Sequence, residues 1–135
     1  MYNRAIWLNL SKRTRDGFTL VELLVVMAIV AMLLTLAVPR YFGSVQKSKE
    51  AVLKQDLTRI RDSLDKYYGD VGKYPDTLDD LVVRKYLRGI PRDPITESES
   101  TWVVVPPDDP EKGGIYDVHS GADGIAVDGS PYVEW

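Results

Sequence analysis

The sequence predicts an α+β fold, in which a long amino-terminal helix packs its distal half on a small antiparallel β-sheet with one short helix. Three observations predict it: an apolar run near the amino terminus, an amphipathic stretch that continues from it at helical spacing, and short strand-like runs separated by Gly and Pro toward the carboxy terminus. The chain has 135 residues, enough for one domain and too few for two.

The apolar run comes first. From Phe18 to Val38 the chain reads FTLVELLVVMAIVAMLLTLAV, 21 residues with a single charge at Glu22. A helix of this length spans about 31 Å, close to the hydrocarbon thickness of a bilayer. Residues 1–17 carry four basic side chains and one acidic one, a net charge of +3. This bias predicts a single-pass inner-membrane protein in which residues 1–17 face the cytoplasm, 18–38 span the membrane and 39–135 form a periplasmic domain.

The amphipathic stretch follows Pro39. Its apolar residues recur at spacings of three, four and seven and predict a helix with one buried face that continues from the membrane segment. These residues are Phe42, Val45, Val52, Leu53, Leu57, Ile60, Leu64, Tyr67, Tyr68 and Val71. The charged residues between them, including Glu50 and Asp56, are assigned to the solvent side. Gly69 and Gly72 mark the end of the helix.

The remaining residues predict a small lid over that buried face. Thr77 and Asp80 have capping-box spacing and open a short helix. Residues 102–105 and 115–119 are strand candidates, and Ala126-Val127 is a candidate for a third, short strand. Four tyrosines are expected to cover the seam between helix and lid: Tyr67, Tyr68, Tyr74 and Tyr86.

Composition excludes many function classes. The chain has no cysteine, which excludes disulfides, thiolate nucleophiles and cysteine-based metal sites. A lone histidine, His119, leaves no room for the usual His-rich catalytic metal sites. Residues 18–135 carry 13 basic and 19 acidic groups, a net charge of -6, which argues against a nucleic-acid partner. The adjacent acidic pairs Asp79-Asp80 and Asp108-Asp109 have no nucleophile beside them, so the chain is predicted not to be an enzyme.

Three interpretations of the apolar segment compete. An ordinary signal peptide cut after Ala37 would release a soluble periplasmic binding module. A plain membrane anchor would keep the segment. Neither explains Glu22, because a carboxylate inside the bilayer costs up to about 3 kcal/mol. The third interpretation, a segment that first anchors and then packs against copies of itself, explains the acid.

Residues 15–22, RDGFTLVE, resemble the processing site of type IV pilins and type II secretion pseudopilins. The resemblance implies that a membrane peptidase cuts after Gly17 on the cytoplasmic side and methylates the new amino-terminal Phe18. Glu22 then becomes the fifth residue of the mature chain. Pro39 falls where this family usually has a helix-kinking proline.

Glu22 would lie one helical turn beyond the new amine of Phe18. It could pair with its own amine or with that of a neighbouring subunit, which would favour one axial register during assembly. The alternative is that Glu22 only complements the amino-terminal dipole of its own helix. The two roles are compatible.

The body resembles the major (G-type) pseudopilin of type II secretion within the type IV pilin-like superfamily. The resemblance rests on Gly72-x-Tyr74-Pro75, Pro91-x-Asp93-Pro94, the run 120–124 (SGADG) and the last tryptophan. It implies a helical filament of copies of this chain, which grows at its base and pushes cargo toward an outer-membrane secretin. The implied partners are minor pseudopilins, a prepilin peptidase and an inner-membrane platform with its ATPase. A type IV pilin of a surface fibre for adhesion, motility or DNA uptake is the alternative.

The resemblance also implies a calcium ion in the last loop, because major pseudopilins usually hold one there. The candidate ligands are Asp117, Ser120, Asp123 and Asp128. The chain lacks the tight acidic pair near its end that is typical of that site. Asp123 and Asp128 could instead be the turn-forming partners of the glycines that follow them.

Overall fold

The computed structural model describes residues 16–135 and divides the chain into two compact units. One unit ends at Pro39, and the other comprises Arg40–Trp135. Residues 1–15, which contain most of the predicted leader, lie outside the described residues.

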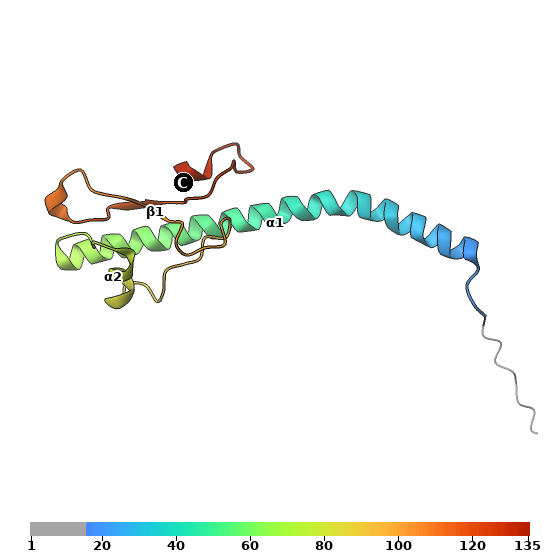
Figure 1. Cartoon of the computed structure of the whole chain (residues 1–135), viewed down its shortest axis with the longest axis horizontal. Helices are drawn as coiled ribbons and strands as arrows, with labels where there is room; N and C mark the ends of the chain where they lie inside the picture. The colour runs from blue at the N-terminus through green and yellow to red at the C-terminus, as the bar shows by residue number, and fades with distance from the viewer. Residues whose placement is uncertain (1–15) are drawn as a thin grey trace, which may run out of the picture. The chain divides into compact units, whose positions relative to one another are not determined.

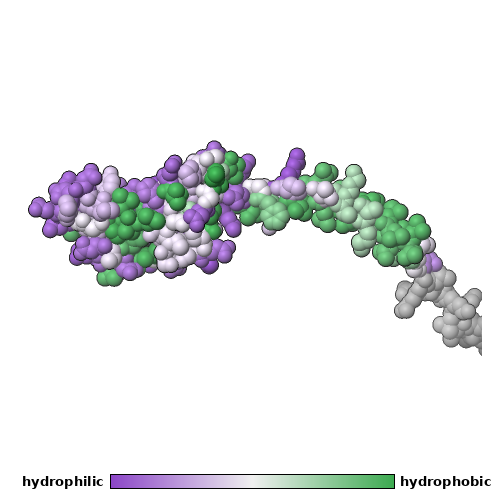
Figure 2. Space-filling model, turned by 45° about the horizontal axis from the view of Figure 1, so that its top comes forward, coloured by the Kyte–Doolittle hydropathy of each residue, from purple (hydrophilic) through white to green (hydrophobic). Residues whose placement is uncertain are grey.

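Helix α1 runs from Leu20 to Val71, 52 residues, and confirms the prediction of one helix that passes from the apolar segment into the amphipathic stretch. It is the one helix among the described residues that is long and apolar enough to cross a membrane. None of its most apolar 18-residue stretch is buried against other parts of the chain. Figure 2 shows a largely hydrophobic surface on the first part of α1. The helix ends where Gly72 adopts φ +81°, and the Gly72 N–H donates to the Tyr68 carbonyl at 2.8 Å.

The buried face of the second unit follows the predicted helical spacing. Its α1 members are Leu53, Leu57, Ile60, Leu64 and Tyr67, and each is at most 6% exposed. The core is completed by Leu81, Trp102, Ile115, Val118, Ala122, Ala126 and Tyr132. A hydrophobic core therefore lies along one side of α1 and is closed by segments from the whole lid.

The periodicity was wrong at five positions of α1. Phe42, Val52 and Val71, assigned to the buried face, are 65%, 45% and 42% exposed. Glu50 and Asp56, assigned to solvent, are buried. Burial raises the pKa of the Asp56 carboxyl, and the Arg59 guanidinium 3.7 Å away partly offsets this effect. Hydropathy alone therefore misplaces the edges of the buried stripe.

The lid contains one short helix and two short strands. Helix α2, Leu78–Val83, begins with the predicted capping box, in which Thr77 and Asp80 each accept a bond from the other's backbone N–H. Strands β1, Val103–Val105, and β2, Asp117–His119, form an antiparallel pair with Val104 opposite Val118. Figure 1 shows α2 and the β1–β2 ribbon beside the second half of α1.

The third strand expected at Ala126-Val127 is not formed. The Ala126 N–H donates to the Ser130 carbonyl at 2.7 Å and the Gly129 N–H donates back to the Ala126 carbonyl at 2.9 Å, so these residues make a tight turn. Gly129 has φ +87°, which favours glycine. The chain then forms a short 3₁₀ helix, η2, at Tyr132–Glu134.

The tyrosine seam is confirmed. Tyr67 packs edge-to-face on Tyr86, with ring centroids 5.4 Å apart. Tyr68 stacks on Tyr74 at 4.4 Å, and Tyr74 in turn meets Tyr116 at 5.6 Å. These contacts join the end of α1 to both the segment before α2 and the segment before β2.

Candidate functional site

The predicted processing site lies just before α1. Gly17 and Phe18 precede the first helical residue, Leu20, and the Phe18 side chain is 86% exposed. A Cβ built on Gly17 would meet no atom within 4 Å. The fold therefore makes no demand for glycine at position 17, and the peptide bond after it is accessible in the described residues.

Glu22 takes part in a capping box at the start of α1. The Glu22 N–H donates to Thr19 Oγ1 at 3.1 Å, and the Thr19 N–H donates to Glu22 Oε2 at 3.4 Å. This is the local role that the sequence left open beside the assembly role. Sequence reasoning missed Thr19, although the spacing Thr19-x-x-Glu22 is itself a capping signal.

Two segments of the family resemblance meet in the globular unit. Asp93, from Pro91-x-Asp93-Pro94, is fully buried and accepts a bond from the Ser120 hydroxyl at 2.6 Å. Its other carboxylate oxygen accepts from the Ile95 and Thr96 N–H groups at 2.8 and 3.3 Å. Next to Ser120, a Cβ on Gly121 would lie 2.0 Å from the Thr101 carbonyl oxygen. The Asp93–Ser120 bond and the close contact at Gly121 thus hold the 120–124 segment against the loop before β1.

We expect Asp93→Ala to lower the free energy of unfolding by about 3 kcal/mol, because the Ser120 hydroxyl and two backbone N–H groups lose their buried acceptor. Urea unfolding in detergent, followed by tryptophan fluorescence, measures the change. Asp108→Ala, at an exposed position, is the matched control and should alter stability by less than about 0.5 kcal/mol. Equal effects of the two variants would contradict this role of Asp93.

The four predicted calcium ligands do not converge. Asp117 Oδ1 accepts from Arg61 Nε at 2.8 Å and from the Val118 N–H at 2.7 Å. The Ser120 hydroxyl is buried and donates to Asp93. Asp128 Oδ1 accepts from both the N–H and the hydroxyl of Ser130, at 2.9 and 2.6 Å.

Asp123, the fourth candidate, is exposed beside its turn glycine, Gly124, which has φ +111°. Within residues 16–135 no group of three or more acidic or histidine side chains is placed to share a metal ion. Calcium requires six to eight oxygens, and here a guanidinium already neutralises Asp117. As arranged, these residues do not fit a calcium ion, and calcium binding stays a prediction.

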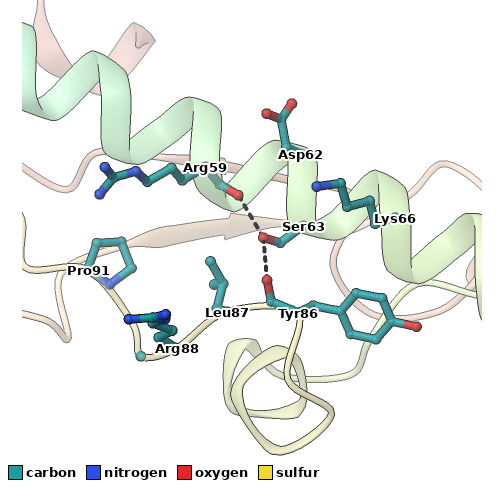
Figure 3. Close-up of a pocket in the computed structure, with 9 residues that line it drawn as sticks. Arg59, Asp62, Ser63, Lys66, Tyr86, Leu87, Arg88 and Pro91 are labelled. Atoms are coloured by element: carbon teal, nitrogen blue, oxygen red, sulfur yellow. Dashed lines mark hydrogen bonds between the residues drawn. The ribbon is translucent and has the colours of Figure 1, made fainter.

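A basic groove of about 440 Å³ lies between α1 and the segment that follows α2. Arg59, Asp62 and Lys66 of α1 line one side of it, and the segment from Tyr86 to Pro91 lines the other (Figure 3). The Ser63 hydroxyl bridges the two walls by donating to the carbonyls of Arg59 and Tyr86 at 2.8 and 3.2 Å. With Arg88 the groove has three cationic side chains and one acidic one, so it suits an acidic protein surface better than a catalytic reaction.

His119 has a structural place. Its Nδ1 lies 2.6 Å from the Trp135 backbone oxygen, and its Nε2 lies 3.8 Å from Asp117 Oδ2. The ring therefore links β2 to the last residues of the chain.

An accessible Gly–Phe bond before a capped, exposed apolar helix, followed by a small α+β unit, defines the class of prepilin-like proteins. The family model described as the prokaryotic N-terminal methylation motif matches residues 12–38. No solved structure matches the chain.

Curated relatives extend this similarity into the globular unit. The type II secretion system core protein G of Aeromonas hydrophila is 32% identical, over 63% of this chain and 71% of that protein. The protein of the same name from Pseudomonas aeruginosa is 33% identical over the same shares, and that from Klebsiella michiganensis is 29% identical over 62% and 70%. The chain belongs to the type II secretion system core protein G family and is a pseudopilin subunit. Its relatives bear the names of secretion-system core proteins, not of enzymes.

Proposed function

We propose that this chain is cut between Gly17 and Phe18, methylated on Phe18 and polymerised into a helical filament in the periplasm that pushes protein cargo through the outer membrane. The observation that carries the proposal is that the chain has the methylation motif at residues 12–38 and also matches relatives named as secretion-system core proteins over 63% of its length. Before assembly, residues 18–38 hold the subunit in the inner membrane, with its amino terminus in the cytoplasm.

Exposed apolar surface supports assembly with other copies. The large apolar side chains of α1 from Leu20 to Val38 are 44–74% exposed. Each would lie in lipid or against another helix. The globular unit also has an apolar groove, which is distinct from the basic groove and is lined by residues that include Tyr41, Val45, Val52 and Pro94. Packing between apolar helices supplies the cohesion of the filament, and the basic groove at Arg59, Lys66 and Arg88 offers a polar contact to a neighbour.

The further partners follow from the same proposal. A prepilin peptidase removes the leader, an inner-membrane platform and its ATPase drive subunit addition, minor pseudopilins share the filament, and a secretin forms the exit. The subunit itself performs no chemical step. Its mechanical role needs only that subunits enter the filament in one register.

The test is the mass and amino-terminal peptide sequence of the protein extracted from the membranes of its host. The proposal expects a chain that starts at N-methylated Phe18. A chain that starts at Val38 would instead make this a soluble periplasmic protein and overturn the proposal. Overproduction would then distinguish a periplasmic filament from a surface fibre, because immunogold labelling locates each.

A further inference from the structure

Three polar side chains of α1 hold the last segment of the chain. Gln46, Glu50 and Lys54 follow one another at four-residue spacing and therefore lie on one face of the helix. The Gln46 amide donates to the Tyr132 hydroxyl. The Lys54 ammonium lies 4.4 Å from the centre of the Trp135 ring, a cation–π distance.

Glu50 is the centre of this arrangement. Its Oε1 accepts from the Tyr132 hydroxyl at 2.8 Å and from the Val127 N–H at 2.9 Å. Glu50 is only 9% exposed and Tyr132 only 2%. Burial and the neighbouring Glu50 carboxylate raise the pKa of the Tyr132 phenol above its ordinary value. A buried carboxylate with two donors is stabilising, whereas one without them would be costly.

The segment also closes on itself. Trp135 Nε1 donates to the Ser130 hydroxyl at 2.7 Å, and that hydroxyl donates to Asp128. Bonds from the Ser130 hydroxyl and N–H lower the pKa of the Asp128 carboxyl. The Tyr132 and Trp135 rings meet edge-to-face with centroids 5.3 Å apart. The carboxy-terminal segment is thus stabilised both by side chains of α1 and by contacts among its own residues.

We propose that this set of contacts, the carboxy-terminal clasp of Gln46, Glu50, Lys54, Tyr132 and Trp135, does in this chain the structural work for which the family's last loop uses calcium. The clasp holds the same loop that carries Asp123 and Asp128. Oδ1 of Asp117 and Oδ1 of Asp128 already accept bonds from Arg61 and Ser130, and the Ser120 hydroxyl donates to Asp93. The fold of the globular unit is accordingly independent of calcium.

The experiment uses the full chain purified in detergent. Thermal unfolding is followed by near-ultraviolet circular dichroism, once with EDTA and once with excess calcium chloride. We expect the same Tm in both. Glu50→Ala should lower the Tm by about 5–10 °C in both conditions, because two donors lose their buried acceptor. Hydrogen exchange at the Val127 amide should become about tenfold faster or more.

Matched variants make the outcome decisive. Glu50→Gln keeps an acceptor oxygen and should recover much of the Tm, whereas Glu99→Gln, at an exposed position, should leave it unchanged. Should Glu50→Ala fail to fold, Tyr132→Phe removes only one hydroxyl and is expected to lower the Tm by a few degrees. A wild-type Tm that calcium raises and EDTA lowers, with the gain lost in Asp123→Asn, would overturn the proposal and establish the calcium site. A Glu50→Ala Tm equal to that of Glu99→Gln, with Tyr132→Phe also unchanged, would overturn it as well.

Discussion

Glu22→Ala is expected to be processed normally but to lose filament assembly. Glu22 lies beyond the bond that the peptidase cuts, so cleavage at Gly17 does not need it. In the proposed filament its carboxylate pairs with the amine of Phe18 in a low-dielectric bundle. Loss of one partner of such a pair costs about 3 kcal/mol, which corresponds to a roughly hundredfold weaker contact per subunit. Filaments sheared from cells and quantified by immunoblot measure the yield, and intact mass measures processing.

The capping box at the start of α1 supplies the controls for that experiment. Glu22→Gln keeps a side chain that can cap Thr19 but removes the charge. Thr19→Ala removes the cap, at a cost of about 1 kcal/mol, but keeps the charge. If charge pairing sets the register, Glu22→Gln assembles as poorly as Glu22→Ala while Thr19→Ala still assembles. The reverse order of yields would show that Glu22 acts only through its own helix.

The sequence alone was sufficient for the main elements because each depends on local signals. Helical periodicity gives the core positions from Leu53 to Tyr67, and the Thr77–Asp80 capping box gives the start of α2. The strand candidates at 102–105 and 115–119 contain β-branched residues and lie between Pro and Gly, and the structure forms strands within them at 103–105 and 117–119. These signals act over a few residues, so no knowledge of the tertiary fold is needed.

The clasp could not be predicted in this way. Glu50 and Val127 are 77 positions apart, and Glu50 and Tyr132 are 82 apart. A glutamate between apolar positions of a helix is normally exposed, and only a distant phenol and amide make its burial favourable. The same applies to Asp93, whose partner Ser120 lies 27 positions away. The failed third strand has a partly related cause. The turn at Ala126–Ser130 is formed by its own backbone bonds and by Gly129, and the distant Glu50 holds it through the Val127 N–H.

Gly17→Glu is expected to abolish processing, so that the full precursor accumulates in the membrane. Folding would be unaffected, because a side chain on Gly17 has open space around it in the described residues. The substitution therefore acts on the peptidase step alone. Glycine beside the scissile bond lets the substrate backbone approach the protease cleft closely, and a long charged side chain at that position prevents the approach. Intact mass of the membrane-extracted protein distinguishes precursor from mature chain.

The processing experiment separates the prepilin pathway from an ordinary signal peptide. Gly17→Ala, which adds one methyl group, should still be cut at least in part, while Asp16→Asn should be cut as well as wild type. An ordinary signal peptidase acting near Ala37 would tolerate Gly17→Glu, because position 17 lies 20 residues before that site. A fully processed Gly17→Glu protein would therefore contradict the assigned cleavage bond. In an uncut subunit the Phe18 nitrogen is still in the peptide bond to Gly17, so the amine that Glu22 is proposed to pair with is absent. Gly17→Glu should therefore also yield no filaments. The amine of Phe18, and not merely the apolar helix, is then what assembly requires.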